Sequence, residues 1–293
     1  MKILIIASVL APLLSSAAGN PIREDSRLSR QTVEQAKSVN KPILVISPSN
    51  TGRSPNLLEN RHISQFLSKH FVIEQAAPRQ GSGDYAIYNE RGELIHRVVD
   101  EKYPYELAAK IKRALDPNTQ YYTLLARFER GDRSANMLQN LIIGASDADD
   151  RANVPRVMQA YLETLPAEPT EAAIRFISRH TKRSSEPGFA FLLDRSASVD
   201  QLAEIIFNET FVARLDDRKA DATAIAAELK RSYPADALAP HIDRMPITFL
   251  EMREDWDGLR EVLPLFVQTY GKQLSPKMLE YYAWLSDSYM VNK

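Results

Sequence analysis

Few side chains in this sequence could carry out nucleophilic or redox chemistry. The 293 residues include no cysteine, so the chain can neither form a disulfide nor supply a thiolate. Ser38 and Lys41 have the Ser-x-x-Lys spacing of serine acyl-enzymes, in which the lysine assists the hydroxyl. The companion Ser-Asp-Asn and Lys-Thr-Gly motifs are missing from the chain, so we interpret this pair as the end of a helix that leads into a strand.

Metal and cofactor chemistry finds little support in the pattern of residues. No two histidines have the i, i+4 or His-x-His spacing of a metal pair; they are His62, His70, His96, His180 and His241. We expect each of them to be a surface or lightly structural residue. Gly81, Gly83 and Ala86 match part of a dinucleotide fingerprint, but they precede a predicted strand, whereas that motif must open a helix. The sequence therefore predicts neither a metal nor a cofactor.

Two charged runs in the second half of the chain could bind an ion or an anionic partner. The acidic run 147–150 offers carboxylates for a hard cation, but no glycine turn or closing glutamate follows at calcium-loop spacing. The basic run 179–183 could contact an anion. We interpret the first as a capped, solvated loop and the second as a solvated helix end.

The first 18 residues have the three parts of a secretory signal peptide. Lys2 provides a single cation, residues 3–14 are mostly apolar, and Ser16 and Ala18 supply the small −3 and −1 residues that a signal peptidase needs. We therefore expect a protein that is exported, to the periplasm or outside the cell, with a mature chain starting near Gly19. No other apolar run approaches the length of a membrane span, so membrane integration is not expected.

The overall charge argues against a nucleic-acid partner. Lys and Arg number 37 and Asp and Glu number 38, which gives a net charge of −1 and no global field that would attract a polyanion. The length and the 44% hydrophobic content are sufficient for two domains, each with its own core.

Residues 19–116 show the pattern of a small α/β domain. The apolar run 43–47 predicts a strand buried on both faces. Residues 85–88 and 93–98 predict a β-hairpin, whose turn ends in a glycine. Helices are expected at 31–37, 56–70 and 104–115, and a further strand at 71–74.

Residues 117–293 carry no strand signal and predict an all-helical, solenoid-like domain. Apolar residues recur at helical spacing along this segment, and the connections between predicted helices are short. We expect the domain boundary near Asp116, because a residue before proline is pushed out of helical geometry. The doublets 121–122 and 281–282 are tyrosine pairs that cannot both face one way on a helix, so one member of each is expected near the surface.

Three segments resemble the thioredoxin-like superfamily, in particular exported members with a helical C-terminal extension. Residues 41–46, Lys-Pro-Ile-Leu-Val-Ile, are similar to the lead-in and first central strand of that family. Residues 85–97 are similar to its β-hairpin, and the Ala283-Trp284 pair in a tyrosine-rich last helix is similar to the end of the extension. The resemblance covers most of the expected mature chain and implies a thioredoxin-like fold for the α/β domain.

The same resemblance implies that the redox site has been lost. Thr51, Gly52, Arg53 and Ser54 occupy the place of the catalytic Cys-x-x-Cys segment, with Thr51 and Ser54 where the two sulfurs would stand. Gly83 takes the place of the cis-proline that precedes the hairpin. Hydroxyl groups are not ionised near neutral pH and form no disulfide, so thiol–disulfide exchange is excluded at this degenerate site.

Three functional interpretations remain open at the level of sequence. The first is a redox-inactive protein that binds a protein or peptide partner or serves as a scaffold. The second is an enzyme of non-thiol chemistry, or an accessory to thiol–disulfide exchange by another protein; the third is a structural accessory of an envelope assembly. The absence of a recognisable catalytic constellation favours the first.

Overall fold

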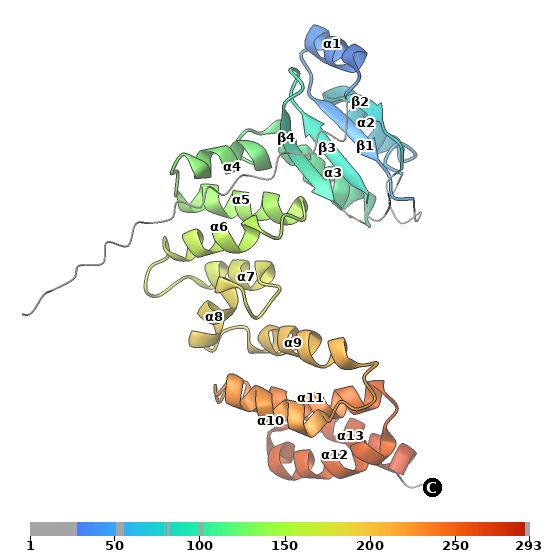
Figure 1. The fold of residues 1–293 in the computed structure, drawn as a ribbon, viewed down its shortest axis with the longest axis vertical. Coiled ribbons are helices and arrows are strands. Elements are labelled where there is room, and N and C mark those ends of the chain that lie inside the picture. Colours follow the sequence, from blue (N-terminus) through green and yellow to red (C-terminus); the bar gives the residue numbers. More distant parts are fainter. Residues whose placement is uncertain (1–27, 51–55, 79, 81–82, 100–101, 291–293) are drawn as a thin grey trace, which may run out of the picture.

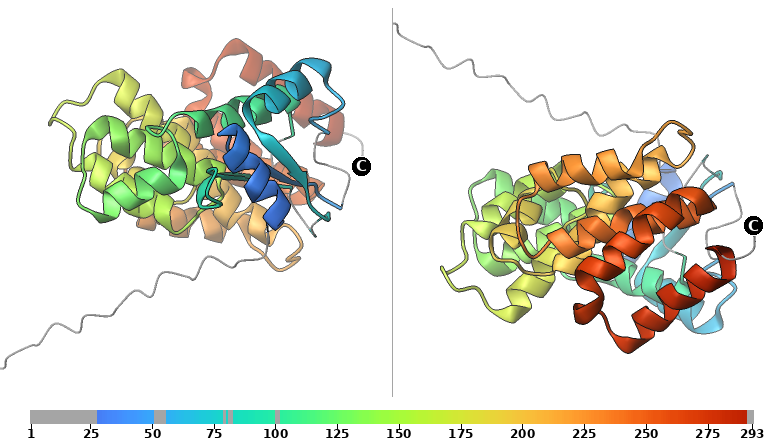
Figure 2. Two further views of the ribbon diagram at one scale, coloured as in Figure 1. Left: turned by 90° about the horizontal axis from the view of Figure 1, so that it is seen from above. Right: turned by 90° about the horizontal axis from the view of Figure 1, so that it is seen from below.

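The computed structural model describes residues 28–50, 56–78, 80, 83–99 and 102–290. These residues form a mixed four-stranded sheet with three flanking helices at one end of an elongated molecule (Figure 1). The remaining helices are stacked along the long axis, and Figure 2 looks along this stack from both ends. The arrangement confirms the prediction of an α/β part followed by a helical part.

The sheet is built around the predicted apolar strand. Its strands are β1 (Ile43–Ser47), β2 (Val72–Gln75), β3 (Asp84–Tyr88) and β4 (Leu94–Val99), in the order β2-β1-β3-β4. Strand β1 pairs in parallel with β2 and antiparallel with β3, and β3 pairs antiparallel with β4. All five residues of β1 are buried, as expected for an inner strand covered on both faces.

Helices cover both faces of the sheet, because alternate residues of β1 point to opposite sides. Helix α1 (Arg30–Val39) places Ala36 against Ile43 and Val45 on one face. Helices α2 (Arg61–His70) and α3 (Pro104–Lys112) pack on the other face, in a cluster that includes Leu44 and Ile87. The α/β part therefore has the three layers that bury a two-sided sheet.

Helix α2 begins later than the sequence pattern predicts. The apolar spacing favours a helix from Asn56, but residues 56–59 form a turn in which Leu57 is buried. The side-chain oxygen of Asn60 accepts hydrogen bonds from the backbone N–H groups of His62 (3.1 Å) and Ile63 (3.2 Å), which caps the helix at this point. The helix thus starts well beyond the segment from Thr51 to Ser54, instead of directly after it.

The second part contains ten α-helices among residues 117–290 and no strand. Their side chains form a single apolar cluster that runs from Tyr121 to Leu285. The helices are α4 (Tyr121–Glu129), α5 (Ala135–Asp147), α6 (Asn153–Leu162), α7 (Glu171–His180), α8 (Pro187–Asp194), α9 (Val199–Thr210), α10 (Ala222–Ser232), α11 (Ala239–Met252), α12 (Trp256–Tyr270) and α13 (Pro276–Met290).

The tyrosine doublet 281–282 divides between surface and core as predicted, whereas both members of 121–122 pack against the core. Tyr121 is fully buried and Tyr122 partly buried, whereas Tyr281 is exposed and Tyr282 is buried. Among the described residues, no helix is long and apolar enough to cross a membrane.

Candidate functional site

Gly83, the one described residue of the predicted degenerate site, lies at one end of the sheet. The strand register pairs Ser47 with Asp84 and Asp84 with Val99. The end of β1, the start of β3 and the end of β4 therefore lie at the same end of the sheet, where the strands meet their loops. Gly83 is buried and directly precedes β3 at this end, where the sequence places it. Thr51, Gly52, Arg53 and Ser54 lie outside the described residues, in the segment that follows β1.

A partly buried ion pair lies at this sheet end. The Arg97 guanidinium donates two hydrogen bonds, from Nε and Nη2, to the Asp84 carboxylate at 2.8 and 2.9 Å. Asp84 is 8% exposed, and its hydrogen bond raises the pKa of Arg97 further above its ordinary value. Since the two side chains hold each other across β3 and β4, we assign the pair to fixing the hairpin and not to proton transfer.

Two exposed tyrosines flank the same end of the sheet. Tyr103 and Tyr105 follow β4 at the start of α3 and are 63% and 65% exposed. The Asn60 side-chain N–H donates to the Tyr105 hydroxyl at 3.3 Å, which ties α3 to the capping residue of α2. An exposed ring with an apolar body and a polar tip suits a protein interface. No motif or spacing in the sequence marks these two residues.

His96 is buried where the sheet meets the helical stack. It is fully buried on β4, and its Nδ1 accepts a hydrogen bond from the backbone N–H of Tyr121 at 3.1 Å. Burial, assisted by the nearby Arg113 charge, lowers the pKa of His96 to about 4, although the Lys110 carbonyl opposes the shift. This histidine therefore serves the contact between the two parts, a role that its sequence surroundings do not reveal.

An ion-pair cluster strengthens the same junction. The buried carboxylate of Asp147 on α5 lies 3.5 Å from Lys110 Nζ and 3.9 Å from Arg113 Nε, which belong to the α/β part. Arg113 also donates to the Asn140 carbonyl at 3.3 Å. The acidic run thus begins with a residue that joins the two parts.

The two charged runs meet around one cavity in the helical part. The cavity has a volume of about 460 Å³ and lies between the α5–α6 turn and the α7–α8 turn. Its wall includes Asp149, Asp150, His180, Lys182 and Arg183. This site is not visible in the sequence, because the two runs are far apart in the chain and come together only when α5–α6 stacks on α7–α8.

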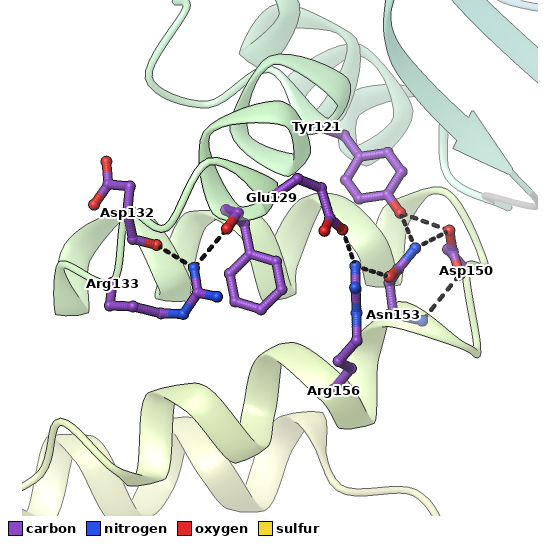
Figure 3. Close-up of polar contacts among 8 residues, drawn as sticks. Tyr121, Glu129, Asp132, Arg133, Asp150, Asn153 and Arg156 are labelled. Carbon is purple, nitrogen blue, oxygen red and sulfur yellow. Dashed lines mark hydrogen bonds and ion pairs between the residues drawn. The ribbon is translucent and has the colours of Figure 1, made fainter. Parts of the chain in front are cut away.

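The carboxylates around this cavity are already held by the protein. Asp150 accepts from the Tyr121 hydroxyl at 2.6 Å and from the Asn153 side-chain N–H at 2.9 Å (Figure 3). Burial opposes ionisation of Asp150, but these hydrogen bonds outweigh it and keep the pKa of this carboxyl below its ordinary value. Asp149 pairs with Arg151 Nε at 3.0 Å, and Glu186 accepts from the Lys182 backbone N–H at 2.7 Å.

His180 lines the cavity and is held by Ser146. Its Nδ1 lies 3.1 Å from Ser146 Oγ, and that hydroxyl donates to the Ile142 carbonyl at 2.9 Å. Because the hydroxyl hydrogen is used, the proton between the two side chains belongs to Nδ1. Burial, followed by the charges of Lys182, Arg179 and Arg113, lowers the pKa of His180 to about 4.

These contacts predict opposite tautomers for the two histidines at pH 7. His96 accepts a hydrogen bond at Nδ1 and should carry its proton on Nε2, whereas His180 donates from Nδ1 and should carry its proton there. Ring nitrogen chemical shifts in a long-range proton–nitrogen NMR spectrum distinguish the two forms. Finding the same tautomer at both positions would contradict the hydrogen-bond assignments.

No group of metal-ligating side chains occurs within the described ranges 28–50, 56–78, 80, 83–99 and 102–290. No protein-family model, curated protein or solved structure matches this chain.

Proposed function

We propose that this protein is an exported, redox-inactive thioredoxin-like protein that binds a protein or peptide partner at one end of its sheet. This end, called the loop end below, is the one where β1 and β4 end and β3 begins. Three arrangements support the thioredoxin-like assignment. The strand from the Lys-Pro lead-in is an inner strand, the predicted hairpin is formed by β3 and β4, and Gly83 directly precedes that hairpin. Export rests on the signal-peptide pattern of residues 1–18.

The pair of exposed tyrosines at the same sheet end as Gly83 supports a binding role over catalysis. Tyr103 and Tyr105 present most of their ring surface to solvent, next to the end where Gly83 lies. The charged residues described at that end, Asp84 and Arg97, are committed to one another. Aromatic side chains surrounded by a rim of polar residues are typical of the centre of a protein interface.

Affinity capture from an envelope extract tests this proposal. The amount of partner captured by the Tyr103→Ser/Tyr105→Ser variant should be roughly tenfold lower than the amount captured by the unaltered chain. The reason is that anchoring tyrosines commonly contribute most of the binding energy. A matched Met252→Ser/Leu265→Ser variant removes two similarly exposed apolar side chains, 51% and 64% exposed, from the helical part. Equal capture by the tyrosine variant and the unaltered chain would contradict the proposed surface.

A further inference from the structure

The cavity between the α5–α6 and α7–α8 turns is separate from the binding surface proposed at the loop end of the sheet. It is formed entirely by residues between Ala145 and Glu186, and its volume of about 460 Å³ falls within the range of small-ligand sites. It brings together charged, hydrogen-bonding and apolar side chains, so its chemistry can be matched to a ligand.

The charged side chains of this cavity that have no partner within the described residues are positively charged. Asp149, Asp150 and Glu186 are occupied by the protein contacts described above. Lys182 and Arg183 are exposed on the opposite turn, and their side chains have neither an ion pair nor a hydrogen bond to any described residue. The charges in the wall balance formally, but the groups that are free to bind a ligand are two cations.

The other wall residues indicate which groups an anionic ligand of this cavity would carry besides its negative charge. Ala145, Val154 and Pro155 give the cavity an apolar surface. The hydrogen bond of His180 Nδ1 to Ser146 leaves Nε2 as the acceptor of the ring, since the low pKa of His180 keeps the imidazole neutral at pH 7. A ligand that fits therefore combines a carboxylate, a nearby N–H donor and an apolar side chain.

We propose that this cavity binds the free C-terminal end of a peptide. The terminal carboxylate pairs with Lys182 and Arg183, the last amide N–H donates to His180, and the last side chain packs on the apolar wall. Capture of a terminal carboxylate is an established mode of peptide recognition, and arginine is well suited to a carboxylate. This site is separate from the proposed surface at Tyr103 and Tyr105, and its test does not depend on that surface.

Calorimetric titration of the full mature chain with N-acetyl-Leu-Leu and with its C-terminal amide tests the proposal. The acid should bind at least roughly tenfold more tightly than the amide at low salt, and added salt should weaken binding of the acid alone. The acid should also shift the His180 ring signals in NMR spectra, while those of His62, on α2, stay unchanged.

A charge-matched pair of variants locates the site. Lys182→Gln/Arg183→Gln should lower the affinity for the acid at least roughly tenfold. The control Lys272→Gln/Lys277→Gln removes the same charge from exposed positions outside the cavity and should bind as the unaltered chain does. All four side chains are exposed, so the fold should persist, which circular dichroism checks. Equal binding of acid and amide, no binding of the acid at millimolar concentration, or full affinity in the cavity variant would each overturn the proposal.

Discussion

A fragment of residues 19–116 should fold alone, and its His96 should titrate well above the value of about 4 found in the full chain. The two apolar clusters of the α/β part use no side chain beyond Leu115, so the fragment keeps its cores. It loses α4, whose Tyr121 N–H binds His96 Nδ1 and whose packing excludes water from the ring. The pKa should rise towards the ordinary value of 6.5, with Arg113 retaining a part of the lowering.

Circular dichroism and an NMR titration of the fragment measure both results. His62, which is exposed on α2 in the full chain, supplies a reference ring signal in both spectra. An unfolded fragment would mean that the two parts share one core and that the predicted boundary at Asp116 is wrong. A folded fragment with His96 still near pKa 4 would mean that the sheet alone buries this residue.

Acidification between pH 7 and pH 4 should strongly destabilise the full chain. His96 and His180 both have folded-state pKa values of about 4, below the ordinary value of 6.5. The unfolded chain therefore takes up protons first, and stability is lost progressively as the pH falls from about 6.5 to about 4. Each shift corresponds to about 3 kcal/mol at most, and the share of His180 should be smaller because that ring is partly exposed.

Urea unfolding at pH 7 and pH 4.5 measures this loss. His96→Asn keeps an acceptor near the Tyr121 N–H but does not titrate, so its stability should depend less on pH than that of the unaltered chain. His62→Asn, at an exposed position on α2, is the matched control for a His-to-Asn replacement. A His96→Asn variant with the same pH dependence as the unaltered chain would show that His96 is not the source of the effect.

The sequence was sufficient for features that depend on local pattern. The apolar run of β1, the glycine at the end of the hairpin turn and the divided tyrosine doublet 281–282 all follow from side-chain spacing and backbone preference. Gly92, for example, has φ +85°, a conformation that favours glycine.

Features that depend on contacts between distant segments could not be predicted. The start of α2 was misplaced because the capping hydrogen bonds of Asn60 outweigh the apolar spacing of the preceding residues. The burial of His96 requires α4, and the cavity requires two charged runs from separate helix pairs. Only Gly83 of the predicted degenerate site lies within the described residues, so the assignment of residues 51–54 stays a prediction.

Photo-crosslinking in living cells tests the proposed partner-binding surface most directly. Benzoylphenylalanine replaces Tyr105 in one version of the chain and Leu265 in another; both positions are exposed to a similar degree, 65% and 64%. A partner that docks at the loop end of the sheet should give a discrete crosslinked product from position 105 and none of that product from position 265. No crosslink at position 105, or the same products from both positions, would contradict the account.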